Sequence, residues 1–224
     1  MNTSDRALLL FSGLCGIVGP LILVGSFAIN PSPPPGLSTA ALAAWAALRE
    51  GQLLLGGWLQ GIGSLLIVVF ALALVELGGA ASGFAGRITQ LAGATILAVS
   101  LIEVTFYLAV AQAVAAGDVA TGLISGGLIK AVQHVFLIAP ALLLPIGLVI
   151  LRSRVLGRSF GYSALAIGAS LQALGLAGVL VPLQPVVDVV LIVQAAWFVA
   201  AGVATVLRGL SGARVGDLAP SPTS

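Results

Sequence analysis

Long apolar runs separated by short polar connections organise the whole chain. The runs cover residues 7–29, 51–75, 88–114, 122–151, 159–181 and 185–207. Each is long enough to cross the hydrocarbon core of a bilayer, which takes about 20 apolar residues in a helix. The pattern therefore predicts an all-α integral membrane protein, a six-transmembrane-helix bundle that forms a single domain over residues 1–208.

The first run is too long for the core of a signal peptide, so we expect a retained span. Pro20 should kink this span, because its ring removes a helix hydrogen bond. The connection that follows, residues 30–50, is rich in proline. Within it, Ser38 is placed to cap a short helix that ends near Leu48, and Trp45 suits a position at the membrane surface.

Composition points to a membrane protein as well. Hydrophobic residues make up 59% and charged residues 7% of the chain, whereas soluble domains carry about 25% charged residues. The net charge of +2 is too small for a nucleic-acid footprint. The partners we expect are the lipid bilayer and, through Gly- and Ala-rich helix faces, a protein partner or a second copy. Cys15 is the only cysteine, which excludes an internal disulfide.

Basic residues are distributed unequally between the two sides of the expected bundle. The segments that share a side with both termini carry Arg6, Arg87, Arg152, Arg154, Arg158, Arg208 and Arg214. The opposite side carries Arg49 alone, next to Glu50. Because cytoplasmic loops are enriched in Lys and Arg, both termini are predicted to be cytoplasmic. Residues 30–50 are then extracytoplasmic, and residues 209–224 form a flexible cytoplasmic tail.

Lys130 is the only lysine among the nine basic residues, and Ala, Gly, Leu and Val are abundant. This usage suggests a GC-rich bacterial genome. The expected location is therefore the bacterial cytoplasmic membrane, with the protein crossing it several times.

Ionisable and amide side chains interrupt the two apolar runs at the centre of the chain. Glu103 lies in the third run. The fourth contains Lys130, Gln133 and His134. Charged groups at membrane depth cost about 2.5–3.5 kcal/mol each on insertion scales and usually face the bundle interior. These residues are therefore the first candidates for a functional site.

Depth and helix face allow these groups to meet. At a rise of about 1.5 Å per residue, Glu103 and His134 lie roughly 25 and 23 Å from the cytoplasmic side of two antiparallel helices. Glu103 shares its face with Tyr107, and Lys130 shares its own with Gln133 and His134. We predict that Glu103 pairs with Lys130 or His134 in the bundle interior.

Three glutamines on other runs fall in the same broad layer: Gln60, Gln172 and Gln194. Gln60 lies between Gly57 and Gly61, a spacing typical of close helix contact. One interpretation is a buried polar cavity suited to a proton relay or a small solute. The other is hydrogen bonding that only holds the helices together, at about 0.6 kcal/mol per contact.

No pattern typical of catalysis or metal binding occurs in the chain. One histidine cannot build the usual metal sites, although His134 as a single axial haem ligand stays open. We therefore name no catalytic residue, no cofactor and no metal ligand.

The leading prediction is a protein that binds or translocates protons or a small solute through a polar site near mid-membrane. Pro20 and Pro140 each fall in the first helix of a three-span half, as do the broken helices of transporters with inverted repeats. The alternative is a non-catalytic accessory or assembly subunit of a membrane complex. An intramembrane enzyme is the third possibility.

Overall fold

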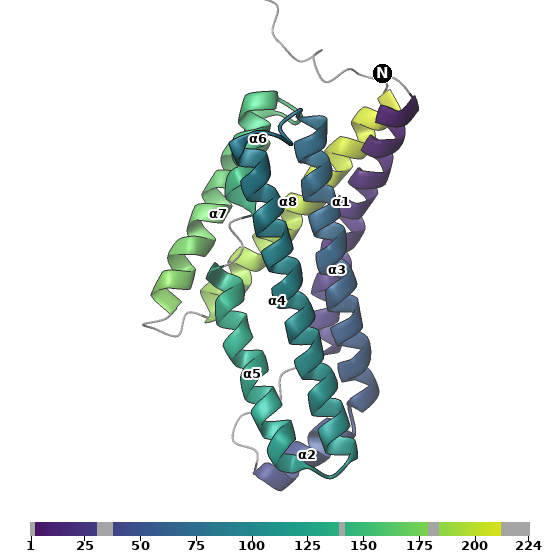
Figure 1. Cartoon of the computed structure of the whole chain (residues 1–224), viewed down its shortest axis with the longest axis vertical. Coiled ribbons are helices and arrows are strands. Elements are labelled where there is room, and N and C mark those ends of the chain that lie inside the picture. The colour runs from purple at the N-terminus through teal and green to yellow at the C-terminus, as the bar shows by residue number, and fades with distance from the viewer. Residues whose placement is uncertain (1–2, 31–37, 139–141, 179–183, 212–224) are drawn as a thin grey trace, which may run out of the picture.

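The computed structural model describes residues 3–30, 38–138, 142–178 and 184–211, and these form eight helices and no strand (Figure 1). The helices are α1 (Thr3–Ile29), α2 (Thr39–Ala47), α3 (Glu50–Leu77), α4 (Phe84–Ala115), α5 (Val119–Ile138), α6 (Leu143–Ser153), α7 (Arg158–Gly178) and α8 (Gln184–Ser211). The predicted all-α class is confirmed.

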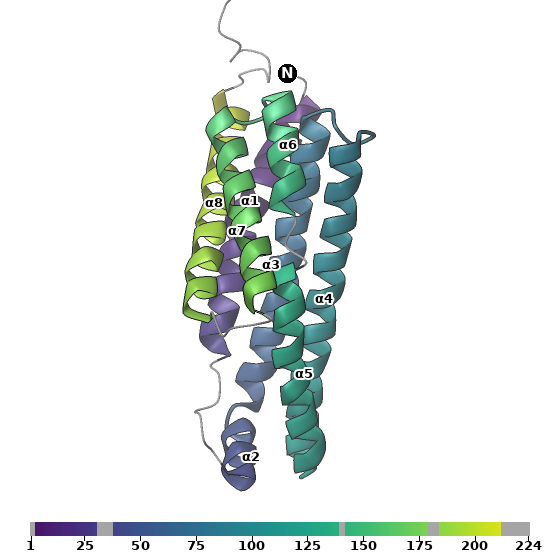
Figure 2. The same cartoon turned by 90° about the vertical axis from the view of Figure 1, so that its left-hand side faces the viewer.

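The helices form a closed ring. Helix α1 packs between α3 and α8, α3 packs on α4, and α4 packs on both α5 and α6. Helix α7 contacts α5, α6 and α8 and thereby completes the ring. Helices α5 and α6 lie end to end and together occupy one position in it (Figure 2). Helix α2 lies at the end of the bundle opposite the N-terminus, against α4 and α5 (Figures 1 and 2).

Five of the helices, α1, α3, α4, α7 and α8, contain a stretch long and apolar enough to cross a membrane. Large apolar side chains such as Phe11, Leu21 and Ile192 are exposed on their outer faces. Contiguous exposed apolar surface of this kind requires an apolar environment. By length and composition, the fold is consistent with an α-helical membrane protein.

The fourth apolar run, residues 122–151, contains two helices. Helix α5 ends at Ile138 and α6 begins at Leu143, and residues 139–141, which include Pro140, lie outside the described residues. Pro145 explains where α6 begins. It falls in the first turn of α6, where a backbone N–H has no acceptor within the helix and its absence costs little.

The main apolar core lies where α3, α6, α7 and α8 converge. Phe70 of α3 and Phe198 of α8 are fully buried there, in an edge-to-face contact with ring centroids 6.3 Å apart. Trp197 contributes its ring to the same core, and its indole N–H donates to the Phe160 carbonyl and to Ser163 Oγ of α7. Buried tryptophans usually need such a partner for their N–H group.

Glycine lets the helix backbones touch. A Cβ atom added at Gly63 of α3 would lie 2.8 Å from the Leu23 nitrogen and 2.9 Å from the Gly19 oxygen of α1. A Cβ atom at Gly202 of α8 would lie 2.7 Å from the Gly13 oxygen. Close approach at small residues is a main source of helix association in membranes, so these contacts hold α1 between α3 and α8.

Helix α2 follows the proline-rich segment, and Ser38 accepts a hydrogen bond from the Ala41 N–H as its cap. The Arg49 guanidinium lies 4.9 Å from the centroid of the Trp45 ring, a cation–π contact at the end of the bundle. The proline-rich segment itself, residues 31–37, and the tail beyond Ser211 lie outside the described residues.

The turn between α4 and α5 is closed by Asp118. Its carboxylate accepts hydrogen bonds from the Thr121 backbone N–H at 3.1 Å and the Thr121 hydroxyl at 2.6 Å. These two bonds hold the pKa of the Asp118 carboxyl below its ordinary value, and the bond from the Thr121 hydroxyl has the larger effect. The N-terminus of α5 therefore carries the charged cap that helix starts favour.

We expect Gly63→Ala to destabilise the protein, because the added methyl group would meet backbone atoms of α1 that cannot move independently of that helix. Overpacking of this kind typically costs about 1–3 kcal/mol. The matched control is Gly25→Ala on α1, where a Cβ atom meets nothing within 4 Å. Thermal unfolding in detergent measures both variants. Equal melting temperatures for Gly63→Ala and wild type would contradict the close contact.

Candidate functional site

Helices α3 and α4 run antiparallel and meet along a row of facing positions. Gly57 faces Tyr107, Gln60 faces Glu103, and Ser64 faces Ser100. Each step of three or four residues along α3 is matched by a similar step back along α4, as expected when one face of each helix is in contact. We call the hydrogen-bonded residues Gln60, Ser64, Ser100 and Glu103 the polar ladder.

The central contact of the polar ladder joins Gln60 and Glu103. The Gln60 Nε2 group donates a hydrogen bond to Glu103 Oε2. The two residues are only 1% and 2% exposed, respectively. Glu103 lies about 28 Å along α4 from its first residue and about 18 Å from its last. A carboxyl group is thus held inside the bundle, well away from both helix ends.

The next contact of the polar ladder lies toward the basic end of the bundle. Ser100 Oγ donates to Ser64 Oγ at 2.9 Å, and both side chains are buried. On the other side of Glu103, Tyr107 is buried and packs against Leu53 of α3 and Ala46 of α2. An apolar cluster therefore borders the polar ladder at its α2 end.

Chemically, the polar ladder combines a carboxyl group, a primary amide and two hydroxyl groups. A carboxyl group can bind or release a proton, and hydroxyl groups can both donate and accept hydrogen bonds. Across the part of the chain that the structure describes, no group of three or more His, Cys, Asp or Glu side chains gathers that could hold a metal ion. The arrangement is suited to handling a proton or to binding a small polar molecule.

The predicted partners of Glu103 on the neighbouring helix are Lys130 and His134, and Gln133 is predicted to share their face. All three belong to α5, which packs against α4. Their side chains lie outside the part of the molecule that the structure describes. The pairing of Glu103 with Lys130 or His134 therefore stays a prediction.

Of the other predicted site residues, the structure brings Gln60 and Tyr107 to the Glu103 face, whereas two glutamines lie elsewhere in the ring. Gln172 is half-buried on α7 and Gln194 is half-buried on α8. The Gln194 Oε1 atom is buried without a hydrogen-bond partner among the described residues. The main neighbours of these two helices are α1, α5 and α6, and each other.

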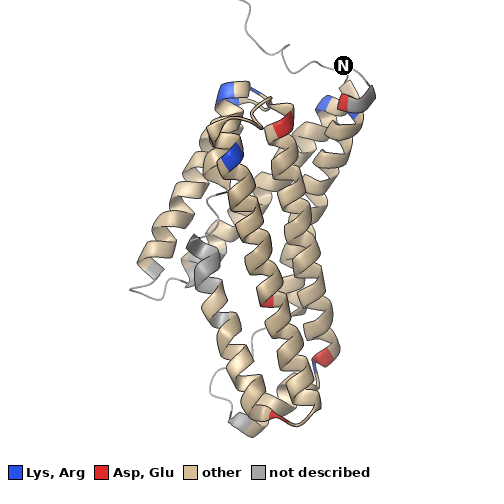
Figure 3. Cartoon of the chain, viewed as in Figure 1, with Lys and Arg blue, Asp and Glu red and all other residues tan. Residues whose placement is uncertain are grey.

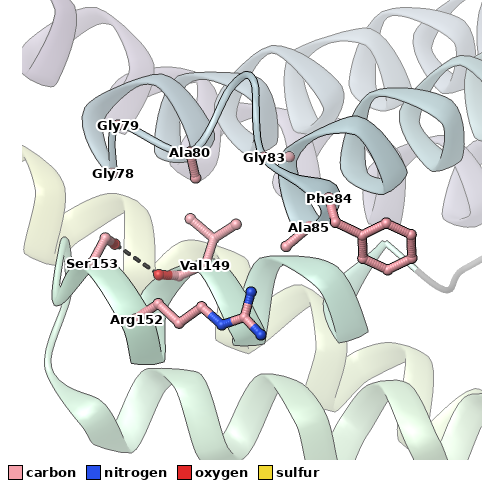
Figure 4. Close-up of a pocket in the computed structure, with 10 residues that line it drawn as sticks. Gly78, Gly79, Ala80, Gly83, Phe84, Ala85, Val149, Arg152 and Ser153 are labelled. Atoms are coloured by element: carbon pink, nitrogen blue, oxygen red, sulfur yellow. Dashed lines mark hydrogen bonds between the residues drawn. The ribbon is translucent and has the colours of Figure 1, made fainter.

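A second polar feature was not expected from the sequence. A pocket of about 210 Å³ lies between the α3–α4 turn and the end of α6 (Figure 4). Arg152 of α6 runs beneath the turn, and the residues that face it from the turn are mainly glycine and alanine. The available signals were a glycine-rich segment at residues 78–86 and the basic segment 152–158, but nothing in the sequence shows that these two segments meet.

Comparison with known proteins identifies no relative of the chain. No protein-family model, curated protein or solved structure matches the chain.

A double-mutant cycle on Gln60→Leu and Glu103→Leu tests the central contact. Each single change removes one side of a buried hydrogen bond, which costs about 1–3 kcal/mol. The double variant should lose less stability than the sum of the losses in the two single variants, by about 0.5–3 kcal/mol. Thermal or denaturant unfolding in detergent measures the three variants.

The matched control for this cycle is Gln90→Leu, the same chemical change at an exposed position of α4. It should leave stability nearly unchanged and should show no coupling to Glu103→Leu. Strictly additive losses for Gln60→Leu and Glu103→Leu would argue against the contact.

Proposed function

We propose that the protein binds or translocates protons or a small solute through the polar ladder between α3 and α4. The observation that carries the proposal is the buried Gln60–Glu103 hydrogen bond, inside two helices that are each apolar enough to span a membrane. Ionisable residues at such depth are rare and usually belong to ion or substrate pathways.

The energetic comparison favours a functional role over a purely structural one. A hydrogen bond between membrane helices contributes about 0.6 kcal/mol on average. Placing an acidic residue at the centre of a membrane helix costs about 2.5–3.5 kcal/mol. An amide or hydroxyl pair, such as Ser64–Ser100, would join the helices without that penalty. The packing of α3 on α4 therefore does not require the Glu103 carboxyl group.

The topology that we propose has six spans, with α5 and α6 together forming the fourth. Both are apolar but individually short, and their end-to-end stacking covers the length of one span (Figure 2). Most described Lys and Arg residues gather at the end of the bundle where α1 begins (Figure 3). By the positive-inside rule this end is cytoplasmic, and both termini lie on that side.

The second candidate function is a non-catalytic accessory or assembly subunit. It is favoured by one observation: a Cβ atom added at Gly126 or Gly127 of α5 would meet nothing within 4 Å. A small-residue helix surface that no other part of the described chain covers is suited to docking a partner helix. In this case the polar ladder would serve only to join α3 to α4.

We expect Glu103→Gln to abolish proton movement, because an amide keeps the hydrogen-bonding shape of the carboxyl group but cannot release a proton at neutral pH. Proteoliposomes loaded with a pH-sensitive dye and given a proton gradient measure the rate. Glu50→Gln, the same substitution at the exposed start of α3, is the control and should keep wild-type flux.

Wild-type flux in Glu103→Gln would contradict the proposed proton role. Wild-type protein that moves no protons and elutes at constant stoichiometry with another membrane protein would instead favour the accessory role.

Cysteine labelling tests the topology in a Cys15→Ala background. Ser82→Cys, in the exposed α3–α4 turn, should react with a membrane-impermeant maleimide only after the cells are lysed. Ser38→Cys, at the start of α2, should react in intact cells, because it lies at the opposite end of the bundle. The reverse pattern would contradict cytoplasmic termini.

A further inference from the structure

We propose that the pocket between the α3–α4 turn and α6 binds a phosphate group, supplied by the headgroup of an anionic phospholipid or by a soluble phosphate ester. The α3–α4 turn and α6, whose residues line the pocket, lie at the basic end of the bundle, far from α2 (Figures 1 and 3). This inference is independent of the function of the polar ladder.

The cationic group of the pocket is Arg152. Its side chain runs along the floor with the guanidinium group toward the start of α4 (Figure 4). No carboxylate is among the residues that line the pocket. A guanidinium group offers a planar fork of donors that matches two phosphate oxygens, so arginine is the residue best suited to hold this anion.

The walls of the pocket leave room for an anion. Four glycines, Gly78, Gly79, Gly83 and Gly86, line it. Gly79 has a φ of +61° and a Cβ atom at Gly86 would lie 2.1 Å from the Ala80 oxygen, so larger residues at these two positions would distort the turn. The volume of about 210 Å³ exceeds what a phosphate group alone fills and leaves space for its ester substituent.

Further donors and positive charge lie next to the lining residues of the pocket along the chain. The first residues of α4 line the pocket, and N–H groups in a first helical turn have no acceptor within the helix. Arg87 directly follows the lining residue Gly86, and Arg154 directly follows Ser153. These arginines outweigh Glu76, which lies two residues before the lining residue Gly78, so this end of the bundle carries net positive charge that attracts anions from a distance.

The position of the pocket favours a lipid headgroup as the source of the phosphate. Phe84 borders the pocket and is 77% exposed. An exposed apolar ring at the end of a membrane bundle suits contact with the acyl chains of a lipid whose headgroup lies beside it. Basic pockets between membrane helices on the cytoplasmic side are known binding places for anionic headgroups.

Native mass spectrometry of the full chain in detergent tests the proposal with two probes, dioctanoyl phosphatidylglycerol and glycerol 3-phosphate. We expect saturable binding of the lipid to the wild type. Arg152→Gln should weaken it about tenfold or more, the loss expected when charge-assisted hydrogen bonds to the phosphate are removed. Arg158→Gln, an equal charge change at an exposed arginine that does not line the pocket, should change it less than about twofold.

A second variant distinguishes binding inside the pocket from general attraction to the positive charge at this end of the bundle. Ala80→Leu adds volume inside the pocket without changing any charge and should weaken binding as strongly as Arg152→Gln. Saturable binding of glycerol 3-phosphate that is lost in Arg152→Gln would also support the phosphate site and would identify a soluble ester as its ligand. Equal weakening by Arg152→Gln and Arg158→Gln, or no saturable binding of either probe, would overturn the proposal.

Discussion

Direct contact between helix backbones is the constraint on which the rest of this structure depends. In a bilayer, apolar helices gain no hydrophobic energy by contacting one another instead of the lipid acyl chains. Their association therefore relies on close packing. Gly63 meets α1, Gly202 of α8 meets α1 from the other side, and Gly147 of α6 meets the Gly161 oxygen of α7. Three helix–helix interfaces of the ring therefore depend on glycine, which has no side chain to hold the backbones apart.

The polar ladder follows from this packing. Gly63 brings α3 close to α1, and the neighbouring surface of α3 carries Gln60 and Ser64 toward α4. The register of α4 then brings Glu103 and Ser100 opposite them. A side chain at Gly63 would shift α3 and separate these pairs, although it would lie outside the polar ladder itself. The site is thus maintained in part by a contact that lies outside it, on the neighbouring surface of the helix that carries it.

Hydropathy predicted most of the fold, because each of its runs long enough to span a bilayer must satisfy its backbone hydrogen bonds as a helix. It did not predict where in the fourth run a new helix begins, since two prolines in a long apolar run do not show which of them starts one. It singled out Glu103 and Gln60 but not their pairing, because helix rotation depends on neighbours. The Arg152 pocket was missed because glycines and backbone from distant segments form its walls.

The Ser64–Ser100 contact affects how the electrostatic environment inside the bundle can change. A hydroxyl group exchanges the roles of donor and acceptor by rotating about a single C–O bond. The sense of this hydrogen bond can therefore reverse while both backbones stay in place. The α3–α4 interface thus contains a dipole that can flip within a rigid frame, so the electrostatic environment beside Glu103 is able to change without any motion of a helix.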